Sequence, residues 1–118
     1  MKKQPLPNLH DATVEEFAFV HHAARLIISV SRYAIDKQPT MRFQLIFSGI
    51  INGEEVALFD QRIRSVLQKE KRSKLEYRID DLSYSTSLPD EEAISFALGI
   101  DHLGCLLIIC RKLSIHES

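Results

Sequence analysis

The most regular alternation of hydrophobic and polar positions lies in residues 41–48, where Met41, Phe43, Leu45 and Phe47 occupy every second place. Successive side chains of a β-strand point to opposite faces, so this spacing gathers the apolar residues on one face. The pattern predicts a central strand over residues 40–48 with Phe43, Leu45 and Phe47 buried.

The segment Leu9–Val30 fits two structures. Thr13-Val14-Glu15-Glu16 matches a helix capping box, and apolar residues recur after it at helical spacing. The same segment also alternates on both sides of His21–Ala24, and its second half is rich in residues that favour strands. That turn contains no Gly, Asn or Pro, so nothing local forces a reversal. Local rules leave both a long helix and a hairpin open.

The middle of the chain changes period. Asn52-Gly53 is a strong hairpin signal, so we expect residues 54–59 to pair back as a short strand. Apolar residues then recur at i, i+4, i+7 and i+8, namely Phe59, Ile63, Val66 and Leu67. This spacing predicts one amphipathic helix over about residues 60–71.

The last third alternates again. Residues 75–84 predict a strand with a kink at Asp80-Asp81, followed by a loop at 83–89. Phe96, Leu98 and Ile100 indicate a strand, although residues 89–92 could instead open a short helix that reaches to 99. Gly104 ends a tight connection, after which Leu107, Ile109, Leu113 and Ile115 predict one long last strand.

Composition places the chain among ordinary globular domains. Its 118 residues are 45% hydrophobic and 26% charged, which suits a single domain over 1–118 with a core of its own. The formal net charge of −1 provides no global attraction to nucleic acid or to an anionic membrane. Its longest apolar runs are too short to cross a bilayer, and the first residues lack the apolar core of a signal peptide. We therefore expect a cytoplasmic protein without a membrane partner.

The spacing of the cysteine and histidine residues provides little evidence for a disulfide, a metal site or a catalytic site. Cys105 and Cys110 stand five apart, so a strand would put them on opposite faces, and we expect buried thiols and no disulfide between them. The five histidines lack the spacing of zinc ligands, so we expect no metal and no other cofactor. His10-Asp11 could be an oriented acid–base pair, but an Asp11 turn that caps backbone amides is the more physical interpretation. No serine elbow, P-loop or dinucleotide motif is present, which argues against an enzyme.

Two charge clusters remain as candidate binding sites. The basic one consists of Arg62, Arg64, Lys69, Lys71, Arg72 and Lys74, and it resembles a nucleic-acid face without the aromatic residues that stack on bases. The solvated side of a helix that runs into a loop explains it better, so nucleic acid is the weaker alternative. The acidic one consists of Asp80, Asp81, Asp90, Glu91 and Glu92, and it suits contact with a basic partner protein.

Three segments of the chain resemble a known group of domains. "LHDATVEEFAFVHHAARLIISV", "RFQLIFSGI" and "GCLLIICRKLSI" resemble, in this order, elements of a loose group of small uncharacterised bacterial domains. Some members of this group are classed with predicted toxin-immunity proteins. The resemblance implies a mainly antiparallel β domain that begins with a strand, a short turn and a second strand, and it implies no activity.

Together these observations predict an α+β, mainly β fold, in which a twisted antiparallel sheet of about six strands packs against one amphipathic helix. We expect a non-catalytic protein-interaction domain, of the immunity type if the resemblance extends to function. The alternatives are a small metal-binding protein or hydrolase that uses His10 and Asp11, and a weak nucleic-acid binder that uses the basic segment 62–74. The sequence leaves a homo-oligomer open.

Overall fold

A computed structural model describes residues 6, 9–32, 40–85 and 93–117. The elements follow one another as β1 (Thr13–Val20), the 3-10 turn η1 (His21–Ala23), β2 (Arg25–Arg32), β3 (Met41–Ser48), α1 (Gly53–Glu70), β4 (Tyr77–Tyr84), β5 (Ile94–Ile100), β6 (Gly104–Cys110) and β7 (Lys112–Glu117). The predicted mainly β, α+β class is confirmed, with seven strands in the described residues where about six were expected.

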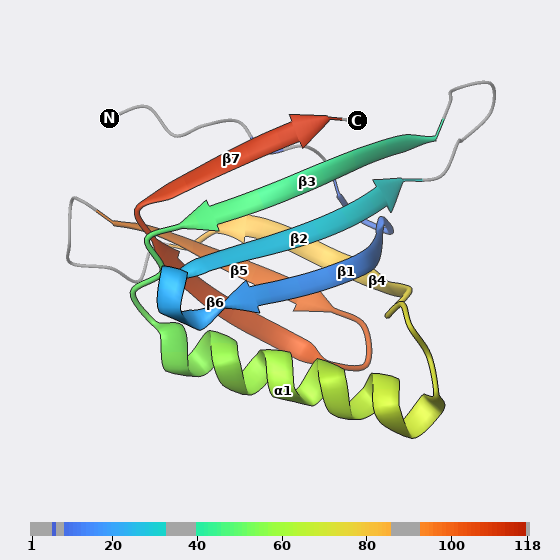
Figure 1. The fold of residues 1–118 in the computed structure, drawn as a ribbon. Coiled ribbons are helices and arrows are strands. Elements are labelled where there is room, and N and C mark those ends of the chain that lie inside the picture. The colour runs from blue at the N-terminus through green and yellow to red at the C-terminus, as the bar shows by residue number, and fades with distance from the viewer. Residues whose placement is uncertain (1–5, 7–8, 33–39, 86–92, 118) are drawn as a thin grey trace.

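The strands form one antiparallel sheet in the order β6-β5-β4-β1-β2-β3-β7. β1 and β4 pair only through Thr13 and Val14, so the sheet divides into a β1-β2-β3-β7 layer and a β4-β5-β6 layer. Figure 1 shows the two layers one behind the other, with α1 along the side where β1 and β6 diverge. Because only Arg111 separates β6 from β7, the chain passes from one edge of the sheet to the other there.

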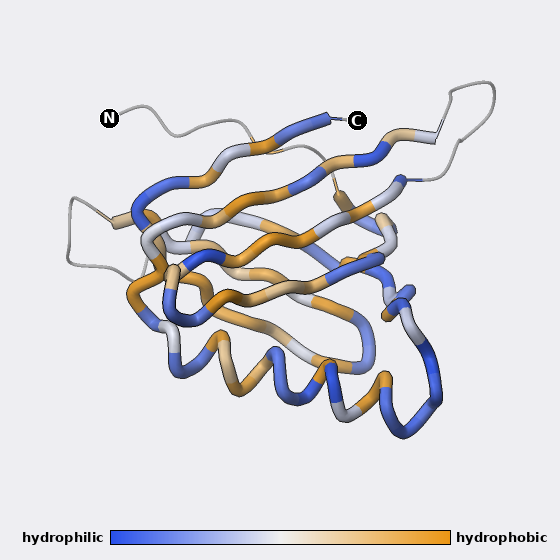
Figure 2. The backbone as a smooth tube through the Cα atoms, viewed as in Figure 1, coloured by the Kyte–Doolittle hydropathy of each residue, from blue (hydrophilic) through white to orange (hydrophobic). Residues whose placement is uncertain are grey.

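The core lies between the two layers. Phe43, Leu45 and Phe47 of β3 are all buried, which confirms the prediction for that strand. The ring of Phe47 meets the ring of Phe96 from β5 edge-on, with 5.4 Å between centroids, and so joins the layers. Figure 2 shows the alternation of hydrophobic and hydrophilic positions along α1. Its side chains Val56, Phe59 and Ile63 are buried.

The hairpin at the N-terminus is confirmed, and the capped helix is wrong. β1 and β2 pair antiparallel from Thr13↔Ser31 to Val20↔Arg25. The turn between them closes without Gly, Asn or Pro because Ala24 adopts a left-handed φ of 50° and donates its N–H to His21 O. A bulge at Glu15 shifts the register between Val14 and Glu16. Thr13 and Val14, which pair with both β2 and β4, are buried.

The predicted strand at residues 54–59 is wrong, because α1 starts at Gly53 and includes these residues. Asn52 makes no hairpin turn. Its Oδ1 accepts a hydrogen bond of 2.9 Å from Ile109 N–H, and its Nδ2 donates one of 2.6 Å to Leu107 O. Ile51 N–H donates to Ile109 O at 2.7 Å. Residues 51–52 therefore occupy the backbone edge of β6, which would otherwise be open to aggregation.

One C-terminal expectation needs correction and two are confirmed. The long last strand is broken at Arg111 into β6 and β7. The buried side chains of β6 are Leu106, Ile108 and Cys110. Gly49 permits the crossing, since its φ is +69° and a Cβ there would lie 3.0 Å from Arg111 Cβ. The kink at Asp80-Asp81 is a bulge in β4, and Phe96, Leu98 and Ile100 lie in a strand. Residues 86–92 lie outside the described part.

Candidate functional site

Two pairs of residues that are far apart in the sequence lie together in the fold. We call this cluster the acidic corner, and it consists of His10, Asp11, Asp80 and Asp81. The loop before β1 lies along β4, where Asp11 N–H donates to Ile79 O at 3.0 Å and Ile79 N–H donates to Ala12 O at 2.7 Å. Asp11 has a left-handed φ of 65° in this turn. The other acidic candidates, Asp90, Glu91 and Glu92, lie outside the described residues.

Both ring nitrogens of His10 face oxygen atoms. Nδ1 lies 2.7 Å from Asp80 O, and Nε2 lies 3.6 Å from Asp11 Oδ2. The hydrogen bond to the Asp80 carbonyl raises the pKa of His10, and the nearby charge of Asp11 raises it further. A general base needs one ring nitrogen directed at the substrate. The described arrangement engages both and instead favours the protonated ring, so it suits an electrostatic role better than an acid–base one.

The six basic candidates do not share one face of α1. Successive helical residues turn by about 100°, so Arg62 and Lys69 lie on one flank of the buried face while Arg64 lies on the other. Arg64 pairs with Asp60 at 3.1 Å. Lys71 and Lys74 follow the helix.

Arg72 is used within the fold. It pairs with Glu70 at 2.8 Å and with Glu76 at 3.9 Å, donates to Leu75 O, and lies over the ring of Tyr77. The segment 62–74 therefore presents its cations in several directions.

Asp60 is a polar residue inside the helix–sheet interface. It is only 7% exposed, and its Oδ1 has no hydrogen-bond partner in the described structure. Burial raises the pKa of this carboxyl group, and Arg64 opposes that rise only in part. The sequence placed Asp60 at the start of a helix, where a carboxylate is favourable, but the residue lies in the middle of α1.

A search of the described residues for three His, Cys, Asp or Glu side chains able to share a metal ion finds none. Cys105 is exposed and Cys110 is buried, which confirms opposite faces but corrects the expectation that both are buried. Burial raises the pKa of the Cys110 thiol to about 11.

Within the described chain, α1 is too polar to count as a membrane span.

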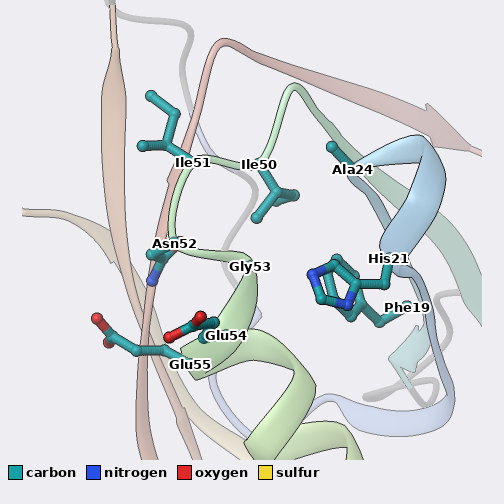
Figure 3. Close-up of a pocket in the computed structure, with 9 residues that line it drawn as sticks. All are labelled: Phe19, His21, Ala24, Ile50, Ile51, Asn52, Gly53, Glu54 and Glu55. Atoms are coloured by element: carbon teal, nitrogen blue, oxygen red, sulfur yellow. The ribbon is translucent and has the colours of Figure 1, made fainter.

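A cleft of about 450 Å³ opens at the first turn of α1. Figure 3 shows Phe19 and His21 on one side of it and the segment from Ile50 to Glu55 on the other. The rings of Phe19 and His21 pack 5.4 Å apart between centroids. Glu54 and Glu55 contribute carboxylates, and the lining contains no Lys or Arg.

A groove of about 600 Å³ follows further along the same helix, between α1 and the β5–β6 turn. Its lining includes Leu58, Arg62 and Val66 of α1 together with His102 and Leu103. Leu103 is buried, whereas the Leu58 side chain is 62% exposed. Among the described residues, its lining has an arginine and a histidine but no carboxylate, so its charge is opposite to that of the first cleft.

This surface was not predicted from the sequence, because residues 54–59 were assigned to a strand. Glu55, Leu58 and Arg62 follow one another at spacings of three and four, which places them on one face of the helix. The helical spacing competed with the hairpin signal of Asn52-Gly53, which led to the strand assignment.

A comparison of the chain with protein-family models, with curated proteins and with solved structures finds no significant match.

Proposed function

We propose that this chain is a non-catalytic protein-interaction domain whose contact surface is the outer face of α1. The observation that carries the proposal is Leu58, a leucine that is 62% exposed beside a groove with an apolar floor. Ile51, at 49%, is the other exposed large hydrophobic residue among those described, and it lies just before the same helix.

Exposed apolar side chains beside a groove are typical of a binding site, because contact with a partner removes their apolar surface from water. Complete burial of a leucine side chain contributes about 1.5–3 kcal/mol. Leu58 does not take part in the core, because the buried side chains Val56, Phe59 and Ile63 already fill the inner face of α1. Its exposure is therefore unrelated to the packing of the domain.

The sequence resemblance supports a protein as the partner, since part of that bacterial group is classed with predicted toxin-immunity proteins. The acidic corner adds a second feature, because Asp80 and Asp81 would steer a basic region of the partner towards the domain. Free thiols at Cys105 and Cys110 suit a reducing compartment such as the cytoplasm.

The test is affinity capture from cells of the source organism with three immobilised proteins: the wild type, Leu58→Asp and the control Gln68→Asp. Gln68 is exposed on α1 but lies outside the groove. We expect one protein to be retained by the wild type and the control and lost by Leu58→Asp, with unchanged melting curves for all three. Equal retention by Leu58→Asp would contradict the proposal.

A further inference from the structure

We infer that α1 docks an amphipathic helix of a partner protein that carries an acidic group, an apolar side chain and a basic group in that order. This inference deepens the proposed function and rests on it. It follows from the order of side chains on the exposed face of α1, where Glu55, Leu58 and Arg62 lie within two turns.

The docking stripe, defined as Glu55, Leu58 and Arg62, carries an acidic residue at one end and a basic residue at the other. Arg62 has no carboxylate partner among the described residues, and its guanidinium is held 5.7 Å from the ring centroid of Phe59. Glu55 likewise has no cationic partner in the described part of the chain. Both charges are therefore available to a partner.

The walls around Arg62 are already ordered. The ring of His102 packs edge-on against Tyr77 at 5.3 Å between centroids, and Leu103, which lines the same groove, is 4% exposed. Since these groups are positioned before a partner arrives, an apolar side chain can enter without reorganising the groove.

The opposite charges of the cleft and the groove determine in which direction a partner helix runs along α1. Glu54 and Glu55 make the cleft at the start of α1 acidic, and Arg62 makes the groove further along basic. Glu55 and Arg62 are seven residues apart, a rise of about 10 Å, and this distance matches a residue pair at i and i+7 on a second helix.

A partner helix that runs antiparallel to α1 places its acidic residue towards its N-terminus and its basic residue towards its C-terminus. This order also suits the partner's own helix dipole, which favours anions at the first turn and cations at the last. A parallel helix would need the opposite order and would oppose its dipole. The order of the charges and the dipole of the partner helix therefore both favour an antiparallel orientation.

The experiment uses synthetic helical peptides of about 18 residues, long enough to form a measurable helix. The first carries Glu, Leu and Lys at i, i+4 and i+7 with alanine-rich spacers; the controls replace the two charged residues by two Lys or by two Glu. Chemical shifts of the full-length ¹⁵N-labelled protein are followed during titration. We expect the Glu–Leu–Lys peptide to shift Leu58, Arg62 and Leu103 and to bind at least about tenfold more tightly than either control.

A nitroxide on the peptide N-terminus reports direction. It should broaden the amide signal of Val66 and leave that of Ile51 sharp. The Arg62→Glu variant should weaken the Glu–Leu–Lys peptide by about tenfold and improve the Lys–Leu–Lys peptide, whereas Gln68→Glu, which is exposed outside the groove, should change neither.

Equal binding of the three peptides, shifts at another surface, no shift up to millimolar peptide, or broadening at Ile51 would each overturn the inference. These results leave the proposed function intact if captured protein is still lost by Leu58→Asp. Capture that does not depend on Leu58 refutes the proposed function whatever the peptides do.

Discussion

Replacing Phe47 by alanine tests whether the two layers of the sheet share one core. The Phe47 side chain is completely buried, and its β3 position pairs with Leu26 of β2 and with Leu113 of β7. Its ring contacts Phe96 from the opposite layer. Truncation therefore removes an aromatic contact between layers as well as buried apolar area.

The expected loss in the free energy of unfolding is about 4–5 kcal/mol, towards the upper end for a buried Phe→Ala change. The edge-on ring contact accounts for about 0.5–1.5 kcal/mol of it. The rest comes from transfer and from a cavity that cannot collapse, because Leu26 and Leu113 are fixed by strand pairing on both sides of β3. Such a loss is a large share of the roughly 5–15 kcal/mol that stabilises a domain.

Urea unfolding followed by far-ultraviolet circular dichroism measures this loss, since the chain has no tryptophan to report by fluorescence. The transition midpoint should fall with an unchanged slope. The matched control is Ile46→Ala on the outer face of the same strand, where the side chain is half-buried and the expected loss is about 1 kcal/mol. A loss below about 1 kcal/mol at Phe47, or equal losses at both positions, would refute the described register.

Three further predictions concern titratable groups. Burial raises the pKa of Asp60 above the ordinary carboxyl value of 3.8, so its carboxyl group favours the folded state at low pH and destabilises it as pH rises through the folded pKa. Asp60→Asn should therefore gain stability relative to the wild type between about pH 3 and 7, and a difference independent of pH would contradict this. The pKa of His10 is raised above 6.5, so its contribution to stability is present below that pH and lost as pH rises through the folded pKa; His10→Gln should lack this loss in thermal melts, and identical pH profiles would count against it. With a thiol reagent at neutral pH, exposed Cys105 should react at once and Cys110 only on unfolding, because burial raises the Cys110 pKa to about 11; two equally fast thiols would show that β6 is not packed as described.

Strand periodicity determined much of the fold before any tertiary contact was known. The two-residue repeat through Phe43, Leu45 and Phe47 identified β3 and its buried face, because a pleat sends alternate side chains to opposite sides. The same repeat located β5 through Phe96 and Leu98. These patterns are local, and the core later confirmed them.

Only part of the candidate site could be predicted from the sequence. The sequence supplied His10, Asp11 and the Asp80-Asp81 pair as separate candidates, but their meeting depends on the alignment of the chain before β1 with β4. Register between distant segments is decided by tertiary pairing, which no local spacing encodes. The exposed stripe on α1 was not predicted either, since Glu55 and Leu58 had been assigned to a strand.

Asn52 shows most clearly where local rules end. Asn-Gly favours a tight hairpin when two strands are available to flank it. In the folded chain the Asn52 amide instead bonds to Leu107 O and Ile109 N–H at the edge of β6, and α1 starts immediately after it. Only the tertiary structure provides that edge, whose unpaired backbone groups would otherwise be left open. The sequence by itself determined which residues are apolar and with what period, and the closing of the sheet around its core decided which edges, faces and charges come together.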